Sequence, residues 1–297
     1  MRRSDLTGPH GWAGLLLELE RPARPALRVE VAPGRRLAIV QNDEPVLLAR
    51  VDGHYYGIDY LRTERFRSPL RPLRAGESRR IHDPPGAPAA RWAHRFAGEL
   101  LAAGPLHAGR WTIRTEVRGL DVRPGLVRHE HPEGYLGRFS SGAGEVVPLR
   151  ELPSPDDGRV KAYRRQARDG TLPPVLLWWI SGLTAYVVVD GHDRLVAALA
   201  EGEEPPFLVL LRTHDRPLDA EASVREYRRQ VTSVEREVVR GTPGAPQALT
   251  GLHRTWVRAF DHLANGPAPT RAWPMPGGRT AWTCLAAVFG DRTHPWL

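Results

Sequence analysis

The sequence VVVDGHDRLVAA at residues 187–198 decides the fold, because it joins a buried strand to a helix through one tight turn. The three valines before Asp190 predict a strand that is apolar on both faces. Gly191 permits the sharp turn, and the leucine- and alanine-rich residues that follow predict a helix. The free N–H groups of its first turn would lie around His192 and Asp193, where they attract anions such as phosphate.

The charged residues of this turn suggest individual roles. Arg194 could add a charge-assisted contact to a phosphate, and Asp190, at the strand end, is placed to hold Mg²⁺ or to accept a proton. A purely structural role fits the local pattern equally well, with Asp190 capping the helix and Arg194 pairing with it. Asp193 puts a carboxylate close to the expected phosphate, either as a metal ligand or as a first-turn acid that points away.

Short, well-punctuated elements surround the turn between residues 146 and 212. The patterns predict a helix that Ser154 or Asp156 caps and that runs to about residue 168, and a second helix over residues 195–200. Strands are expected at residues 146–149, 175–180, 185–189 and 207–211. The order strand, helix, strand, strand, helix, strand predicts a small mixed α+β sheet with helices.

In order and spacing, these residues resemble the ParB/sulfiredoxin superfamily. The resemblance covers residues 146–212 and rests on VPL at 147–149, DG at 169–170, LPPV at 172–175, YVVVDGHDRL at 186–195 and Pro206. It implies a nucleoside triphosphate, ATP or CTP, whose phosphates lie at the turn. On that basis Gly191, His192, Asp193 and Arg194 are the expected nucleotide-binding residues.

Members of the superfamily use the nucleotide differently, and the turn discriminates among them. Sulfiredoxins need a cysteine within the turn, where this chain has Gly191 and His192. Chromosome-partition proteins, which bind CTP and DNA, typically have Gly-Glu-Arg-Arg and a following helix-turn-helix, and neither is apparent here. The free-serine kinases are closest, because they share Asp-Gly-His-x-Arg and carry an acid after the first loop, at Asp156 or Asp157.

The resemblance therefore implies a phosphotransferase or a nucleotide hydrolase that uses Mg²⁺ and acts on a small hydroxyl-bearing molecule. Asp156, Asp157 and Asp190 would be its catalytic residues, with Asp190 also the metal ligand. The alternative from another class is a DNA-associated binding protein of ParB type without catalysis. A third interpretation is a nucleotide-sensing or purely structural module.

The charge of the chain lies outside the candidate site. The 297 residues carry 42 basic and 34 acidic groups, a net +8, of which residues 1–145 hold +6, residues 146–212 hold −1 and residues 213–297 hold +3. Lys161 is the single lysine, so the basic excess is arginine and is typical of a GC-rich bacterial genome. Seven arginines lie between Arg62 and Arg80, which we expect to form a basic loop or extended arm. A solvated charge run is the favoured interpretation, and contact with DNA phosphates is the alternative.

The flanking segments carry weaker signals, and the chain is expected to divide into residues 1–145, 146–212 and 213–297. A β-rich first part is predicted from strands at 27–31, 37–40 and 46–51, a helix at 90–103 and a glycine- and serine-rich linker at 134–144. Amphipathic helices are predicted at 220–240 and 248–264, covering the sheet or each other, and a last element at 280–289. The lone Cys284 excludes a disulfide framework within the chain. The sequence has no apolar run long enough to span a membrane, so we expect a cytoplasmic protein with no membrane contact.

Overall fold

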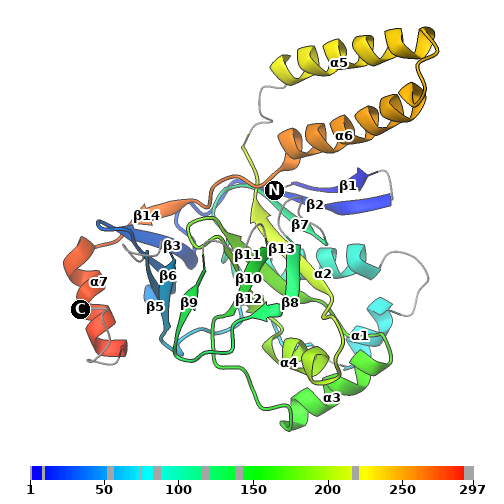
Figure 1. The fold of residues 1–297 in the computed structure, drawn as a ribbon. Helices are drawn as coiled ribbons and strands as arrows, with labels where there is room; N and C mark the ends of the chain where they lie inside the picture. The colour runs from blue at the N-terminus through cyan, green and yellow to red at the C-terminus, as the bar shows by residue number, and fades with distance from the viewer. Residues whose placement is uncertain are drawn as a thin grey trace. The chain divides into compact units, whose positions relative to one another are not determined.

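The computed structural model describes residues 2–8, 11–51, 57–73, 75–82, 88–115, 121–137, 143–215 and 221–290 (Figure 1). Within these ranges the chain forms fourteen strands and seven helices, and the strands make two mixed sheets. The predicted α+β class, with strands early and helices late in the chain, is confirmed.

The larger sheet contains the predicted strands around the turn. Its eight strands lie in the order β1–β2–β7–β13–β11–β12–β10–β8. At its centre, β11 pairs antiparallel with β12 and parallel with β13, and all six β11 residues are buried, as their apolar side chains predicted. The bounds are β1 Arg2–Gly8, β2 Gly11–Leu19, β7 Gly109–Arg114, β8 Asp121–Val127, β10 Ala143–Pro148, β11 Val175–Ile180, β12 Ala185–Asp190 and β13 Phe207–Arg212.

The smaller sheet has six strands in the order β14–β3–β4–β5–β6–β9. These strands are β3 Leu27–Ala32, β4 Arg36–Gln41, β5 Glu44–Val51, β6 Ile58–Arg62, β9 Glu133–Leu136 and β14 Ala272–Pro274. The strands predicted at residues 27–31, 37–40 and 46–51 are confirmed as β3, β4 and β5, which pair antiparallel in sequence order. The linker prediction for residues 134–144 was wrong for β9, and residues 138–142 lie outside the described residues. Gly134 serves close packing in this strand, because a Cβ there would collide with the Tyr60 hydroxyl.

Five helices belong to the same compact unit as the two sheets: α1 Ala75–His82, α2 Pro88–Ala103, α3 Gly158–Arg168, α4 His192–Ala200 and α7 Gly278–Phe289. The α3 and α4 helices pack on each other beside the larger sheet, and α2 packs on β2 and β7 (Figure 1). On the smaller sheet, α7 buries Trp282, whose Nε1 donates to the Leu37 carbonyl at 3.0 Å. None of the described helices combines the length and the apolar character needed to cross a bilayer.

The chain forms two compact units, one of residues 1–212 with 269–297 and one of residues 213–268. This division differs from the three segments expected, because strands from both sides of residue 145 share the larger sheet. In the second unit, α5 (Glu221–Val239) and α6 (Ala245–Asn265) form a hairpin. The two helices pack on each other through Tyr227, Trp256 and Phe260, whose ring centroids lie 5.5–5.8 Å apart.

Candidate functional site

The turn between β12 and α4 has the geometry that its sequence predicted. Gly191 is the N-cap of α4, with φ 97° and ψ 26°, a left-handed conformation that side chains other than glycine rarely adopt. Its carbonyl accepts the first helical hydrogen bond, from the Leu195 N–H at 2.9 Å. Because a glycine N-cap has no side chain to bond the first-turn N–H groups, this helix begins with uncapped donors.

Both oxygens of the Asp190 carboxylate are bonded. The Arg194 Nη2 atom donates to Oδ2 at 2.5 Å, and the Ser68 hydroxyl donates to Oδ1 at 2.7 Å. The Arg194 guanidinium also fills the space beside Gly191, where a Cβ would lie 2.5 Å from Nη2. The structural interpretation of this turn predicted an ion pair between Asp190 and Arg194, which is present, and a helix cap at Asp190, which is wrong because Gly191 is the N-cap.

Asp193 is neutralised by two arginines from neighbouring segments. Arg150, just after β10, donates to its Oδ1 at 2.9 Å, and Arg159 of α3 donates to its Oδ2 at 3.5 Å. The side chains of the two arginines are 40% and 63% exposed, whereas that of Asp193 is 15% exposed. Asp193 therefore holds two accessible guanidinium groups at the N-terminus of α4.

His192 is buried and uncharged at neutral pH. Burial, together with the positive charges of Arg150, Arg194 and Arg62, holds the pKa of His192 well below its usual value. Its ring lies 5.9 Å from that of Phe66, centroid to centroid. His192 is thus a neutral imidazole within a group of arginines.

Several buried nitrogens near the turn have no partner among the described residues. These atoms are Arg62 Nε and Nη2, His192 Nε2 and Arg194 Nε, and each of the three side chains belongs to a residue only 2% exposed. Buried polar groups are normally hydrogen-bonded, and leaving one unpaired costs about 1–3 kcal/mol. Arg62 and Arg194 both act electrostatically on His192, so the three lie in one neighbourhood. The other guanidinium nitrogens there do have acceptors, because Arg62 Nη1 donates to the Pro148 carbonyl at 3.3 Å and Arg194 Nη2 donates to Asp190.

Asp156 and Asp157 are both exposed, before and at the start of α3. Asp157 is the N-cap of this helix, without a side-chain capping bond, in place of the predicted Ser154 or Asp156. The Asp156 carboxylate lies 3.3 Å from the Lys161 amine. Their contacts do not connect these two acids to Asp190.

The donor set does not fit a protein-bound Mg²⁺ at Asp190. Both carboxylate oxygens are engaged, one of them by a guanidinium that would repel a cation. In the described part of the chain, no three His, Cys, Asp or Glu side chains gather as metal ligands do. We therefore assign Mg²⁺ no protein ligand.

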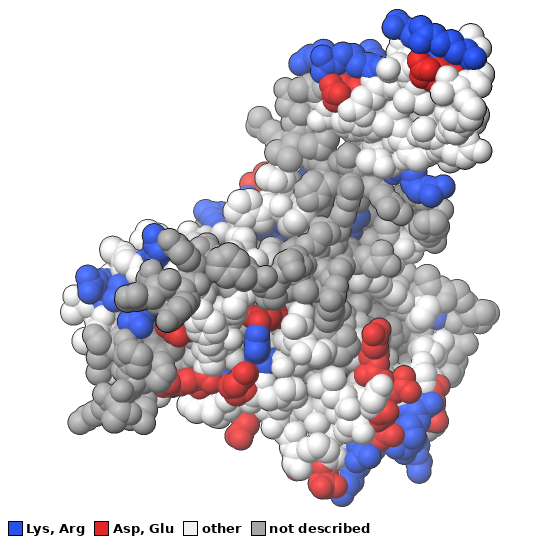
Figure 2. Space-filling model, in the orientation of Figure 1, with Lys and Arg blue, Asp and Glu red and all other residues white. Residues whose placement is uncertain are grey.

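The basic stretch from Arg62 to Arg80 is not a free arm. Arg62 is buried at the end of β6, Arg65 pairs with Glu44 at 3.2 Å, and Arg71 pairs with Glu99. The expectation of a loop or extended arm was wrong for residues 75–82, which form α1, and Glu77 of this helix accepts from Arg95 of α2 at 2.5 Å. On the face drawn in Figure 2, basic and acidic side chains are interleaved, as these pairings imply.

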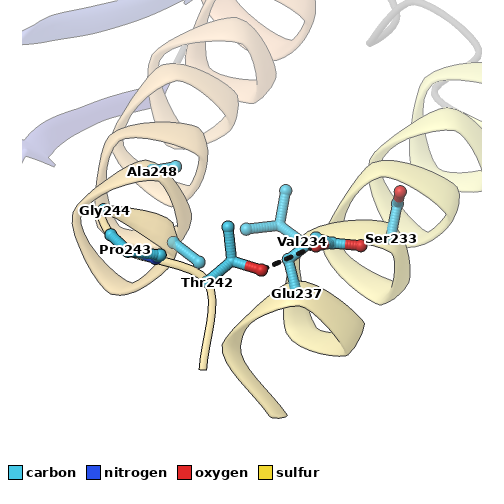
Figure 3. A pocket seen from close by; sticks show the side chains of 8 residues that line it. Ser233, Val234, Glu237, Thr242, Pro243, Gly244 and Ala248 are labelled. Carbon is cyan, nitrogen blue, oxygen red and sulfur yellow. Dashed lines mark hydrogen bonds between the residues drawn. The ribbon is translucent and has the colours of Figure 1, made fainter. Parts of the chain in front are cut away.

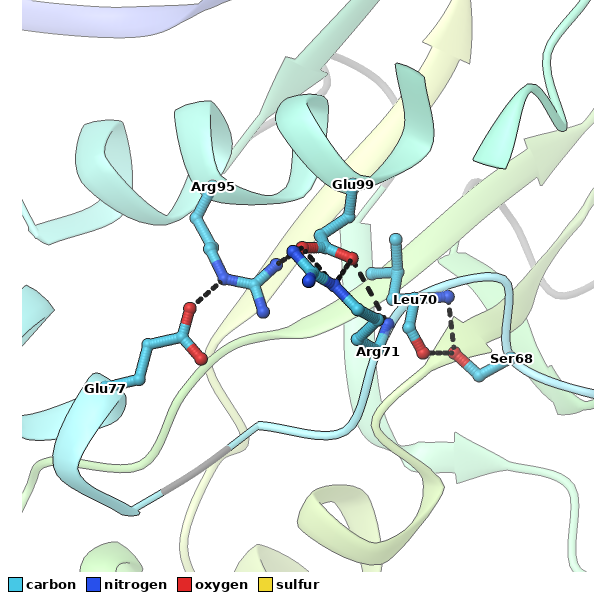
Figure 4. A network of polar contacts seen from close by, with 6 residues as sticks. All are labelled: Ser68, Leu70, Arg71, Glu77, Arg95 and Glu99. Atoms are coloured by element: carbon cyan, nitrogen blue, oxygen red, sulfur yellow. Dashed lines mark hydrogen bonds and ion pairs between the residues drawn. The ribbon is translucent and has the colours of Figure 1, made fainter. Parts of the chain in front are cut away.

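Residues 63–73 form a segment, which we name the Ser68 segment, that is tied to α2. Arg71 donates from Nε and Nη2 to the Glu99 carboxylate at 2.5–3.0 Å, and Arg95 also contacts this carboxylate at 3.1 Å (Figure 4). The Arg71 hydrogen bond lowers the pKa of Glu99, as do the nearby arginine charges. The buried carboxylate of Glu99 thereby fixes the segment that brings Ser68 to Asp190.

A separate pocket of about 330 Å³ lies at the tip of the α5–α6 hairpin (Figure 3). Its carboxylate, on Glu237, already accepts from the Thr242 hydroxyl at 2.8 Å. Most of the other lining side chains are small, such as Ser233 and Ala248. The pocket offers a ligand few polar groups.

The sequence matches no known family model, and no curated protein or solved structure is significantly similar to the chain.

Four of the residues gathered at the turn were not among the predicted site residues: Ser68, Arg62, Arg150 and Arg159. Ser68 is 122 positions from Asp190, so no local spacing could have connected them. The one signal that the sequence offered was the position of Arg62 directly after Tyr60 and Leu61, since an arginine among apolar residues is rarely buried unless it is paired.

Proposed function

We propose that the turn at residues 190–194 binds the phosphates of a nucleoside triphosphate. The observation that carries this proposal is the group of buried, unpartnered nitrogens on Arg62, His192 and Arg194. Phosphate oxygens accept from guanidinium and imidazole donors, and the N-terminus of α4 favours negative charge. A bound phosphate would satisfy donors that the described residues leave unpaired.

The accessible arginines support the same proposal. Arg150 and Arg159 lie on the exposed side of the turn, each held by Asp193. With Arg194 they give three positive charges against the negative charges of Asp190 and Asp193. We assign Arg150 and Arg159 to the outer phosphates, with Asp193 as the residue that positions them.

The catalytic part of the proposal is transfer of the terminal phosphoryl group to a small hydroxyl-bearing molecule, or its hydrolysis. Asp190 is its candidate base, because this carboxylate already accepts a hydrogen bond from a hydroxyl. Asp156 and Asp157 stay candidates for orienting an acceptor, without a contact that supports them. Any Mg²⁺ would arrive with the nucleotide.

Calorimetric titration with ATP, CTP and GTP, each with and without Mg²⁺, tests the binding. We expect one nucleotide to bind and Arg194→Ala to weaken it at least about tenfold, since a lost charge-assisted hydrogen bond is worth about 1.5–3 kcal/mol. Arg164→Ala is the matched control, because Arg164 joins α3 to α4 through Glu201 at 2.5 Å. Failure of all three nucleotides to bind, or equal weakening by both variants, would refute the proposal.

The alternative of a non-catalytic DNA-binding protein has less support. It assigned DNA contact to Arg62 through Arg80, and Arg62, Arg65 and Arg71 are already buried or paired within the chain. A gel shift over a salt series, with Arg65 and Arg67 changed to alanine, tests it. DNA binding that these changes weaken would revive the alternative.

A further inference from the structure

The hydroxyl of Ser68 lies next to the proposed phosphate-binding group. Its Oγ donates to Asp190 Oδ1 at 2.7 Å, and the other carboxylate oxygen accepts from Arg194 Nη2 at 2.5 Å. One carboxylate thus connects a serine hydroxyl to a guanidinium that we assign to phosphate. An acceptor hydroxyl, a base that can take its proton and a cation beside it are the groups that phosphoryl transfer requires.

The position of Ser68 is fixed from both sides of the Ser68 segment. Before it, Gln41 bonds both backbone groups of Arg67, accepting from its N–H at 2.9 Å and donating to its carbonyl at 2.7 Å. After it, the Leu70 N–H donates to Ser68 Oγ at 3.2 Å, and Arg71 is bonded to the buried Glu99 (Figure 4). The contact with Asp190 is therefore a property of a clamped segment.

We infer that Ser68 is a phosphoryl acceptor and that this chain phosphorylates itself there. The inference rests on the proposed function. The Ser68 Oγ attacks the terminal phosphorus of a bound nucleoside triphosphate, its proton passes to Asp190 Oδ1, and the bond from phosphorus to the bridging oxygen breaks. The products are phosphoserine at position 68 and a nucleoside diphosphate.

Phosphoserine at position 68 would change how the Ser68 segment contacts the turn. A phosphoserine carries about −1.5 to −2 charges at neutral pH and would repel the Asp190 carboxylate. The hydrogen bond between Ser68 and Asp190 would be lost, so phosphorylation would release this part of the segment from the turn. Self-phosphorylation would thereby open the space beside Asp190 to another hydroxyl.

Incubation of the full chain with ATP labelled at its terminal phosphate, with Mg²⁺, tests the inference by peptide mapping. We expect label at residue 68 of up to one phosphate per chain, at a rate that does not depend on protein concentration. Asp190→Asn should lower this rate at least about a hundredfold, the usual contribution of a general base. Ser68→Ala should abolish labelling at residue 68, whereas Ser68→Thr should keep it as phosphothreonine. Ser233 is an exposed serine of the helical hairpin, and Ser233→Ala should be labelled fully.

Calorimetry on the same samples separates the two proposals. Nucleotide binding without label at residue 68 would overturn the inference and leave the proposed function standing. Absence of nucleotide binding would overturn the proposed function as well. Label at Ser68 that persists undiminished in folded Asp190→Asn would also overturn the inference. If that variant does not fold, the labels of Ser68→Ala and Ser68→Thr decide: equal labelling of the two would overturn the inference, and phosphothreonine in Ser68→Thr alone would support it.

Discussion

Replacing Gly191 by alanine should destabilise the protein through two separate effects. The first is backbone strain: a residue other than glycine at φ 97° costs about 1–3 kcal/mol. The second is displacement of Arg194, because the new Cβ would lie 2.5 Å from Nη2, 2.8 Å from Nε and 3.0 Å from Cζ.

The second effect has a magnitude of its own. To move, the guanidinium must give up its hydrogen bond to Asp190, between side chains only 3% and 17% exposed. A hydrogen bond between charged groups contributes about 1.5–3 kcal/mol. Gly191→Ala should therefore lower the free energy of unfolding by about 2.5–6 kcal/mol in total.

Gly202→Ala, at the other end of α4, is the matched control. Gly202 also has a left-handed φ, 71°, but no atom lies within 4 Å of the position of its Cβ. It should lose only about 1–2 kcal/mol from strain. The two variants can be compared by urea unfolding followed by tryptophan fluorescence. Trp256 is the only tryptophan in residues 213–268, so the fluorescence mainly reports the unit that contains Gly191 and Gly202. A cost for Gly191→Ala that is no larger than the cost for Gly202→Ala would contradict displacement of Arg194.

Four further predictions concern charged and titratable residues near the site. The pKa of His192 is lower in the folded chain than in the unfolded chain, so His192 does not alter stability above pH 6.5, where both states are uncharged. Below pH 6.5 only the unfolded chain takes up the proton, and the free energy of unfolding falls by up to about 1.4 kcal/mol per pH unit. Urea midpoints between pH 7.5 and 5.5 should show this slope, and His192→Gln should reduce it. Glu99→Gln should cost about 1–2 kcal/mol and speed proteolysis at residues 63–73, and an unchanged cleavage rate would contradict the clamp. The lowered pKa of Glu99 stabilises the folded chain above pH 4.5, so this contribution should disappear as the pH falls below that value. Asp193→Asn should weaken nucleotide binding measured by calorimetry, because it releases Arg150 and Arg159; tighter binding would mean that the carboxylate opposes phosphate.

The elements next to the turn could be predicted because their sequences are punctuated. The six apolar residues of β11 lie between Pro173-Pro174 and Ser181-Gly182, and the predicted bounds were those observed. Gly191 likewise predicted the change from strand to helix at the turn. Where local sequence alone determines the structure, the prediction was accurate.

The first hairpin carried no such signal. Strand β2 has four consecutive buried residues, Gly14 through Leu17, in place of an alternating pattern. A short continuous apolar run fits a buried strand or part of a buried helix equally well. Its pairing with β7, almost a hundred residues later, decides between them.

The basic stretch was misjudged because its partners are distant. The α1 helix is held by Glu77 with Arg95 of α2 and by Ser78, which donates to Gln166 of α3 at 3.2 Å. These contacts span 18 and 88 positions in the chain. The same holds for Ser68 at the site, so the sequence could indicate the turn but not the side chains that surround it.

The central claim is that the unpartnered nitrogens of Arg62, His192 and Arg194 bind phosphate. Side-chain ¹⁵N NMR measures it most directly, with His192→Gln used to assign the imidazole signal. On titration with the nucleotide selected by calorimetry, we predict saturable shifts of His192 Nε2 and of the Nε signals of Arg62 and Arg194, all with one dissociation constant. Nucleotide binding that leaves these three signals unchanged would contradict the claim.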